Sequence, residues 1–207
     1  ADPVGNVCVA TGYGRVSVPY ADKMITEITC HAMGAVWIFD NKDMTIIDIG
    51  GQDTKIICVE QGFVKDFMMN DKCSAGTGRF LEIMANTLSM RPNEMCELAR
   101  EGSGVTISSM CTVFAESEVI SLIGQGEKKE NIAFAVVDSI VRKVAAQANR
   151  MSEDRSMLCL TGGLCECSYI SEALTKELGM EVKTDPQSRY AGAIGAALGA
   201  VKKGKKN

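Results

Sequence analysis

Residues 44–55 read MTIIDIGGQDTK, an apolar strand-like run that ends at a pair of glycines before a second strand-like run begins. Two adjacent glycines let the backbone approach an anionic ligand and direct N–H groups at it. Asp48 and Asp53, on either side of the glycines, could hold a magnesium shell or orient a water molecule. The spacing is neither GxGxxG nor GxxxxGK followed by Ser or Thr, so it supports neither a Rossmann nor a P-loop fold. The stretch indicates another type of phosphate loop, although the glycine pair alone fits an ordinary strand end equally well.

The runs on both sides of this stretch alternate between strand-like and helix-like patterns, which indicates an α/β fold. Gln61 and Gly62 separate two strand-like runs and predict a hairpin turn. Residues 132–149 carry one apolar stripe at helical spacing, which is typical of a core helix. The predicted strands are 7–10, 44–49, 55–59, 63–69, 156–160 and 181–183, and the predicted helices are 21–36, 80–88, one that reaches 123, 132–149, 169–178 and 190–201.

Length and composition exclude several classes of protein. A chain of 207 residues with 46% hydrophobic side chains can bury a core, which excludes a disordered chain. The formal net charge is -4, and the basic cluster is Lys202, Lys203, Lys205 and Lys206, so we expect no nucleic-acid partner. No apolar run approaches the ~20 residues of a membrane span, and the first residues show no signal peptide. We therefore expect a cytoplasmic protein without a membrane partner.

A second glycine pair ends another predicted strand. Thr161, Gly162 and Gly163 close the strand and precede a helix, where small residues expose backbone amides to a nucleotide. Two such loops, far apart in sequence and each after a strand, fit a cleft with a nucleotide between two lobes.

Cys73 and Cys111 each lie in a loop of small residues just before an apolar helix. A thiol at a helix N-terminus is close to unpaired N–H groups and the positive end of the helix dipole, which favours an anionic ligand. Neither cysteine belongs to a C-x-x-C pair, so a zinc knuckle is not indicated. A cubane cluster needs four thiolates, so two per chain become four in a two-fold dimer. The spacing alone also fits two structural cysteines.

The other cysteines and the histidine carry weaker signals. Nine scattered cysteines are an odd number and do not indicate a disulfide framework. Cys165-Glu166-Cys167 is a C-x-C pair that could bind a metal, but no third ligand is near in sequence. His31, the single histidine, lies in a predicted helix and is expected to be a hydrogen-bonded helix residue.

These residues together resemble the ATP-dependent activators of 2-hydroxyacyl-CoA dehydratases, also called archerases, and the ATPase subunits of benzoyl-CoA reductase. The resemblance covers nearly the whole chain, and its two cysteine segments are the most specific. The matching segments are residues 10–15, 29–35, 48–55, 70–81, 108–121, 161–163 and 190–198.

The resemblance implies an α/β fold of the acetate and sugar kinase/actin type, with ATP between two ribonuclease-H-like lobes. Residues 1–70 would be the remainder of the first lobe. Residues 71–207 would form a mostly helical second lobe that carries the cluster ligands and the adenosine motif. The family's first phosphate motif, a D-x-G-[S/T] hairpin, is missing before Val7, and the chain begins without methionine. We therefore expect an incomplete first lobe and a truncated chain.

The same resemblance assigns roles to individual residues. Asp48 and Gln52 would be catalytic, and Gly162 and Gly163 would form the adenosine motif. Gly50, Gly51 and Asp53 would bind the phosphates of ATP with Mg²⁺. Cys73 and Cys111 from each protomer would hold one 4Fe-4S cluster per homodimer. The family often has a Gln shortly after the second glycine pair, where this chain has Cys165-Glu166-Cys167. A carboxylate near the phosphates would repel them in the absence of a metal.

The activity that the resemblance implies is ATP-driven delivery of one low-potential electron to a partner iron-sulfur dehydratase or reductase, with ferredoxin or flavodoxin as donor, under anaerobic conditions. Two alternatives stay open. A small-molecule kinase of the same superfamily would have inert cysteines, and a cluster-binding dimer would lack ATPase activity.

Overall fold

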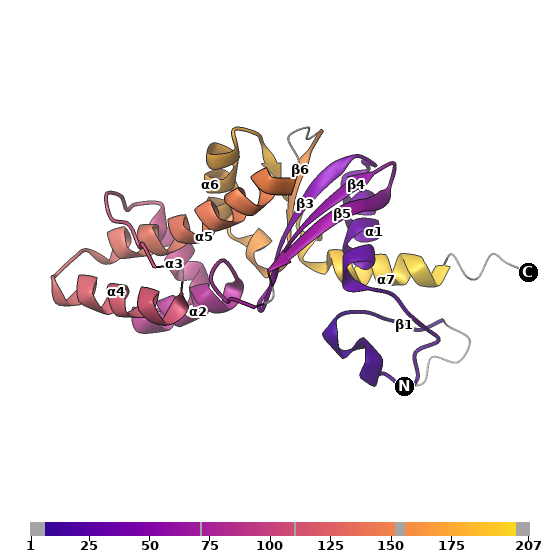
Figure 1. Cartoon of the computed structure of the whole chain (residues 1–207), viewed down its shortest axis with the longest axis horizontal. Helices are drawn as coiled ribbons and strands as arrows, with labels where there is room; N and C mark the ends of the chain where they lie inside the picture. The colour runs from indigo at the N-terminus through magenta and orange to yellow at the C-terminus, as the bar shows by residue number, and fades with distance from the viewer. Residues whose placement is uncertain (1–6, 71, 110, 152–155, 202–207) are drawn as a thin grey trace, which may run out of the picture.

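The computed structural model describes residues 7–70, 72–109, 111–151 and 156–201, so the lysine cluster at 202–206 lies outside the described residues. At its centre is a five-stranded sheet in the order β5-β4-β3-β6-β7 (Figure 1). The strands are β3 (Met44–Ile49), β4 (Thr54–Glu60), β5 (Phe63–Asn70), β6 (Leu158–Thr161) and β7 (Val182–Lys183). β3 pairs antiparallel with β4 and parallel with β6, and all its residues are buried. The apolar run before the first glycine pair is thus the central strand of the sheet.

Helices cover both faces of the sheet (Figure 1). α2 (Gly78–Thr87), α3 (Pro92–Ala99), α4 (Thr112–Gly124), α5 (Lys129–Met151) and α6 (Ser168–Leu178) build the core on one face, and α1 (Glu27–Phe39) lies on the other with α7 (Ala191–Val201) packed against it. Ile47 and Ile49 of β3 contact the first core, and Ile46 contacts the second, as the two-residue period of a strand requires. In the described part of the chain, none of the helices is both long and apolar enough to span a membrane.

Helices α1 and α7 touch backbone to backbone. A Cβ atom at Gly195 would lie 1.8 Å from the carbonyl oxygen of Cys30, and one at Gly34 would lie 1.9 Å from that of Ala191. Only glycine allows so close an approach at these positions. The Gly- and Ala-rich last helix thus packs directly against the backbone of α1.

The predicted helix at 21–36 is wrong at its start. The helix begins at Glu27, because the Thr26 hydroxyl accepts a hydrogen bond from the Thr29 N–H and caps it. The preceding residues instead form β2 (Lys23–Met24), which pairs parallel with β1 (Val9–Ala10). Local helix propensity was overridden by pairing with a distant segment.

The other predicted elements agree with the structure within a few residues. Gln61 and Gly62 have φ angles of 52° and 81°, so the hairpin turn is confirmed. Helix α3 was not predicted, although Pro92 at its first position was an available signal. The lobe boundary after residue 70 stays a prediction, and the sheet combines strands from both sides of it.

Candidate functional site

The two glycine loops lie side by side at the carboxyl ends of β3 and β6. β3 and β6 are parallel neighbours, and Asp48 is in register with Thr161, so the chain leaves both strands at the same edge. Gly162 has a φ of 83° and a ψ of -174°, a conformation that is nearly restricted to glycine. A Cβ atom there would lie 2.4 Å from the carbonyl oxygen of Ile49. The structure therefore brings together two loops that are far apart in sequence.

A groove of about 400 Å³ opens beside these loops. Its lining includes Gly50, Gly51, Gln52, Gly163 and Leu164, together with residues of α2 and residues 90–92. Small-molecule sites in proteins typically have volumes of roughly 300–1,000 Å³. Asp48 and Asp53 are buried at the ends of the loop. The groove is large enough for a nucleotide-sized ligand to contact both glycine loops.

Lys55 joins two buried carboxylates and one partly exposed carboxylate. Its Nζ lies 2.6 Å from Asp53 Oδ1, 3.3 Å from Asp48 Oδ2 and 3.1 Å from Glu27 Oε1. The Tyr13 hydroxyl donates to the other oxygen of Asp53 at 2.9 Å. The two carboxylates that the sequence suggested for a magnesium shell are thus already bonded to groups of the protein.

The surroundings of Asp48 keep its carboxylate ionised. Burial alone would raise its pKa, but the hydrogen bond and charge of His31, the charge of Lys55 and the Thr161 hydroxyl together lower the pKa from 3.8 to about 2. Burial would likewise lower the pKa of Lys55, but the charge of Asp48 and the hydrogen bond to Asp53 raise it above its usual value. At neutral pH both groups are therefore charged.

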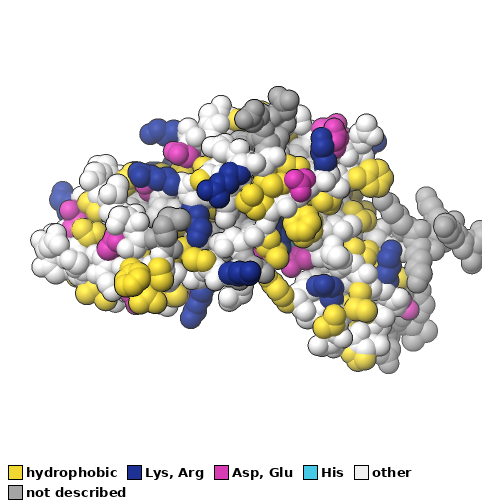
Figure 2. Space-filling model, viewed as in Figure 1, with side chains coloured by type: hydrophobic (Ala, Val, Ile, Leu, Met, Phe, Trp, Pro, Cys, Tyr) yellow, Lys and Arg dark blue, Asp and Glu magenta, His cyan; other side chains and the backbone are white. Residues whose placement is uncertain are grey.

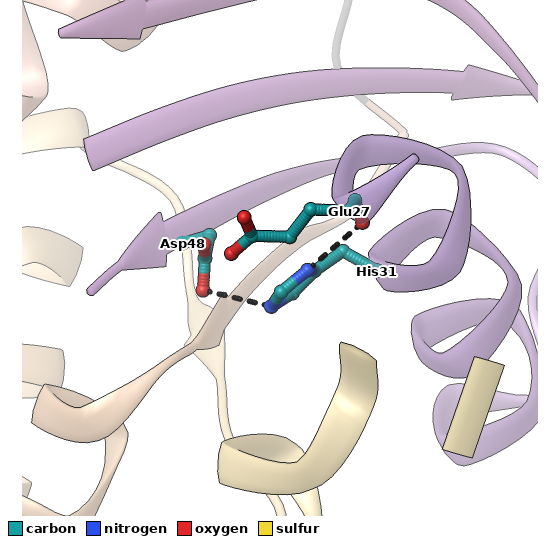
Figure 3. Close-up of side chains that lie close together, drawn as sticks. All are labelled: Glu27, His31 and Asp48. Carbon is teal, nitrogen blue, oxygen red and sulfur yellow. Dashed lines mark hydrogen bonds and ion pairs between the residues drawn. The ribbon is translucent and has the colours of Figure 1, made fainter. Parts of the chain in front are cut away.

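His31 extends from α1 towards Asp48 (Figure 3). Its Nε2 lies 3.3 Å from Asp48 Oδ1, and its Nδ1 lies 3.1 Å from the backbone oxygen of Glu27. The expected hydrogen bond of a helix histidine is confirmed, but the contact with Asp48 was not predicted. The one available signal was the four-residue spacing of Glu27 and His31, which places them on one helix face.

The loops that carry Cys73 and Cys111 meet within one chain. The hydroxyls of Ser74 and Thr112, the residues that follow the two cysteines, are 2.7 Å apart. Cys111 is exposed as the N-cap of α4, and Cys73 is half-buried with the Nζ of Lys143 3.7 Å from its sulfur. An exposed thiol at a helix N-terminus and a thiol beside an ammonium group are both suited to bind an anionic cluster.

Hydrogen bonds connect the Gly50-Gly51 loop to the loop that carries Cys73. At the start of α2, the N–H groups of Gly78 and Arg79 donate to the carbonyl oxygens of Gly50 and Gly51, both at 2.9 Å. The Thr54 hydroxyl donates to the carbonyl oxygen of Gly76 at 2.6 Å. A shift of the Gly50-Gly51 loop would therefore move the segment that carries Cys73.

The C-x-C pair lies in the apolar core. Cys165 and Cys167 are both buried, and burial raises the pKa of Cys165 to about 11. Metal ligation needs thiolates, so this environment disfavours it at Cys165. Glu166 forms an ion pair with Arg189, which offsets the negative charge of this carboxylate.

Comparisons with known proteins identify close relatives. The model of the BadF/BadG/BcrA/BcrD ATPase family matches residues 2–200. The chain is 48% identical over 200 residues to the (R)-2-hydroxyglutaryl-CoA dehydratase activating ATPase of Acidaminococcus fermentans, covering 96% of this chain and 76% of the relative.

Two solved structures are similar throughout the chain. The crystal structure of component A of the A. fermentans dehydratase has a TM-score of 0.91 at 48% identity and covers 96% of this chain and 76% of that one. The activator of the 2-hydroxyisocaproyl-CoA dehydratase from Clostridium difficile, with bound ADPNP, has a TM-score of 0.90 at 40% identity, with coverage of 96% and 74%. The expected actin-like α/β ATPase fold is confirmed.

Proposed function

The chain belongs to the BadF/BadG/BcrA/BcrD ATPase family, and on that premise we propose that it uses ATP hydrolysis to deliver one low-potential electron to an iron-sulfur enzyme. The acceptor would be a 2-hydroxyacyl-CoA dehydratase or a related reductase, since relatives carry the names of dehydratase activators and of a benzoyl-CoA reductase subunit. Ferredoxin or flavodoxin would be the donor. For one electron, each ~59 mV uphill is a tenfold change in equilibrium, so ATP must supply the driving force.

The observation that carries this proposal is the physical connection between the two cysteine loops and the phosphate loop. Ser74 and Thr112 join the cysteine loops, and the N-terminus of α2 joins them to Gly50 and Gly51. A 4Fe-4S cluster held by Cys73 and Cys111 would store the transferred electron. A small-molecule kinase would have no use for this connection.

Two thiols per chain support a homodimer, because a cubane cluster takes four protein ligands. Helix α4, which begins at Cys111, exposes apolar side chains: Val113, Phe114, Ile120 and Ile123 are between 43% and 67% exposed. Figure 2 shows hydrophobic side chains gathered on the surface over this helix. An exposed apolar patch of this kind, next to the proposed cluster ligand Cys111, is typical of a protein–protein contact. A second copy related by a two-fold axis would supply the missing thiols and cover part of the patch.

The groove between the glycine loops supports the ATP site. Gly50, Gly51 and Gly163 let the ligand approach the backbone, and Gln52 lies where it can orient a water molecule. Mg²⁺ would enter with the phosphates of ATP. Asp48 would act from behind the loop, as a fixed negative charge that accepts hydrogen bonds.

The decisive experiment is anaerobic purification followed by iron analysis and visible spectroscopy of wild type, Cys111→Ala and Cys58→Ala. We expect about four irons per two chains in the wild type, with an absorption band that dithionite bleaches. Cys111→Ala should lose both, because each dimer then lacks two ligands. Cys58, in strand β4, is a matched control that should leave the iron content unchanged. ATPase activity of the same samples separates the electron carrier from a cluster-binding dimer.

A colourless wild type, or a Cys111→Ala variant with full iron content, would contradict cluster ligation by these cysteines. A wild type that binds the cluster but hydrolyses no ATP would contradict the ATP-driven part of the proposal.

A second prediction tests the connection between the two loops. Thr54→Val removes the hydrogen bond to Gly76 while keeping the side-chain shape. We expect the effect of ATP on the rate at which a chelator removes iron to shrink roughly fivefold, which corresponds to about 1 kcal/mol of coupling. Thr45→Val, a buried threonine of the neighbouring strand, is the control. Equal responses to ATP in both variants would show that Thr54 carries no coupling.

A further inference from the structure

Both ring nitrogens of the single histidine face hydrogen-bond acceptors. Nδ1 of His31 is 3.1 Å from the carbonyl oxygen of Glu27, and Nε2 is 3.3 Å from Asp48 Oδ1 (Figure 3). A neutral imidazole has one N–H group, so one of these contacts would place two lone pairs against each other. Only the doubly protonated ring donates to both acceptors.

We propose that His31 works as an imidazolium that positions the Asp48 carboxylate for ATP hydrolysis and ties helix α1 to the phosphate loop. The inference rests on the proposed role of Asp48 in hydrolysis. His31 lies outside the set of described residues that line the nucleotide groove, so it is a positioning residue that acts through Asp48.

The hydrogen bonds around Asp48 explain why the imidazolium fixes this carboxylate. Oδ1 accepts from the Thr161 hydroxyl at 3.0 Å and from His31, and Oδ2 faces the Lys55 ammonium at 3.3 Å. These donors come from β6, α1 and β4, so the carboxylate is held from three elements. Loss of the α1 donor would leave one side of Asp48 unsupported.

The residues around the His31 ring leave space for it and supply its charged neighbours. A Cβ atom at Gly192 of α7 would lie 2.9 Å from the ring Cε1, so the glycine leaves space for the imidazole. The charged groups that face His31 are Glu27 from its own helix, Asp48 from β3 and Lys55 from β4. Burial by itself lowers the pKa of His31, but the hydrogen bond and charge of Asp48 outweigh burial and raise it.

The same three residues also have the composition of a metal site. Within the described residues, Glu27, His31 and Asp48 are the only such group whose ligand atoms lie within 4.8 Å of one another. The Lys55 ammonium, however, lies 3.1 Å from Glu27 Oε1 and 3.3 Å from Asp48 Oδ2. A protein cation thus takes the place next to these carboxylates and disfavours a divalent metal ion there. The same charge lowers the pKa of His31, but the contacts with Asp48 and with the Glu27 carbonyl leave it raised.

Nuclear magnetic resonance of protein labelled with 15N-histidine tests the ring state, because one histidine gives one pair of ring signals. At about pH 7.5, a unit above the ordinary histidine pKa, we expect both nitrogens in the protonated range. The signals should not change on addition of Mg²⁺ or Zn²⁺. A single neutral tautomer, or a ring that either metal shifts, would overturn the proposal. This measurement needs no ATPase activity, so it remains decisive if the proposed function fails.

Kinetics of two variants test the positioning role. His31→Asn removes the donor to Asp48, and His31→Gln can keep a donor near the Nε2 position without the charge. We expect His31→Asn to lower kcat roughly 10–100-fold, because a catalytic group shifted by about 1 Å costs that much, while the affinity for ATP is kept. His31→Gln should recover part of the loss. Trp37→Phe, an exposed position on the same helix, is the control. An unchanged kcat in His31→Asn, or equal losses in both His31 variants, would overturn the positioning role.

Discussion

Lys55→Met is expected to destabilise the fold by about 3–5 kcal/mol, the usual cost of removing one partner from a buried ion pair. The Lys55 side chain is 2% exposed and lies within 3.3 Å of oxygens of Asp48, Asp53 and Glu27. Methionine fills a similar volume but leaves the buried Asp53 carboxylate without its cation and leaves Asp48 with one cation fewer. Chemical denaturation at neutral pH measures the loss.

A matched control for this variant lies on the neighbouring strand. Lys65 forms an ion pair with Glu60, but both side chains are more than half exposed. Lys65→Met should therefore leave the free energy of unfolding almost unchanged. If both variants were equally stable, the buried cluster would not depend on the charge of Lys55.

Lys55→Met should also change the response of the fold to acid. In the wild type the pKa of Asp48 falls from 3.8 to about 2, so its contribution to stability is present above pH 3.8 and is lost as the pH falls towards 2. Without the charge of Lys55 the pKa of Asp48 rises, and acid unfolding of Lys55→Met should begin at a higher pH. An acid transition at the same pH as in the wild type would contradict this assignment.

Gly162→Ala is the second substitution with a large expected effect. The left-handed backbone at Gly162 costs a residue with a Cβ atom roughly 1–3 kcal/mol, and the new Cβ would lie 2.4 Å from the Ile49 carbonyl oxygen and 2.7 Å from Asp48 Oδ1. The two glycine loops must therefore separate. We expect a lower melting temperature and no measurable binding of ATP in calorimetry.

Gly163→Ala is the control at the next position. A Cβ atom at Gly163 would meet no described atom within 4 Å, and its backbone is helical. This variant should keep the melting temperature of the wild type, even though Gly163 lines the groove beside the glycine loops. A Gly162→Ala protein with wild-type stability and ATP affinity would show that the loops can move apart without cost.

The sequence by itself determined the elements whose patterns are local. The buried run at residues 44–49, the Gln61-Gly62 turn and the apolar stripe of α5 were all predicted, because strand and helix periods and turn preferences depend on near neighbours. The glycine loops were located for the same reason. The start of α1 was misplaced, since residues 23–24 pair with a strand that the local pattern does not include.

Only the tertiary structure decided which side chains surround Asp48. Lys55 faces Asp48 from the paired strand, while Glu27 and His31 reach it from α1 and Thr161 from β6. No local period encodes contacts between such distant segments. The bond between Ser74 and Thr112 likewise depends on how α2 and α4 pack. The sequence located the candidate site residues. The packing of helices on the sheet determined the charge states of Asp48 and Lys55 and the connections between the loops, because these depend on burial and on partners remote in the chain.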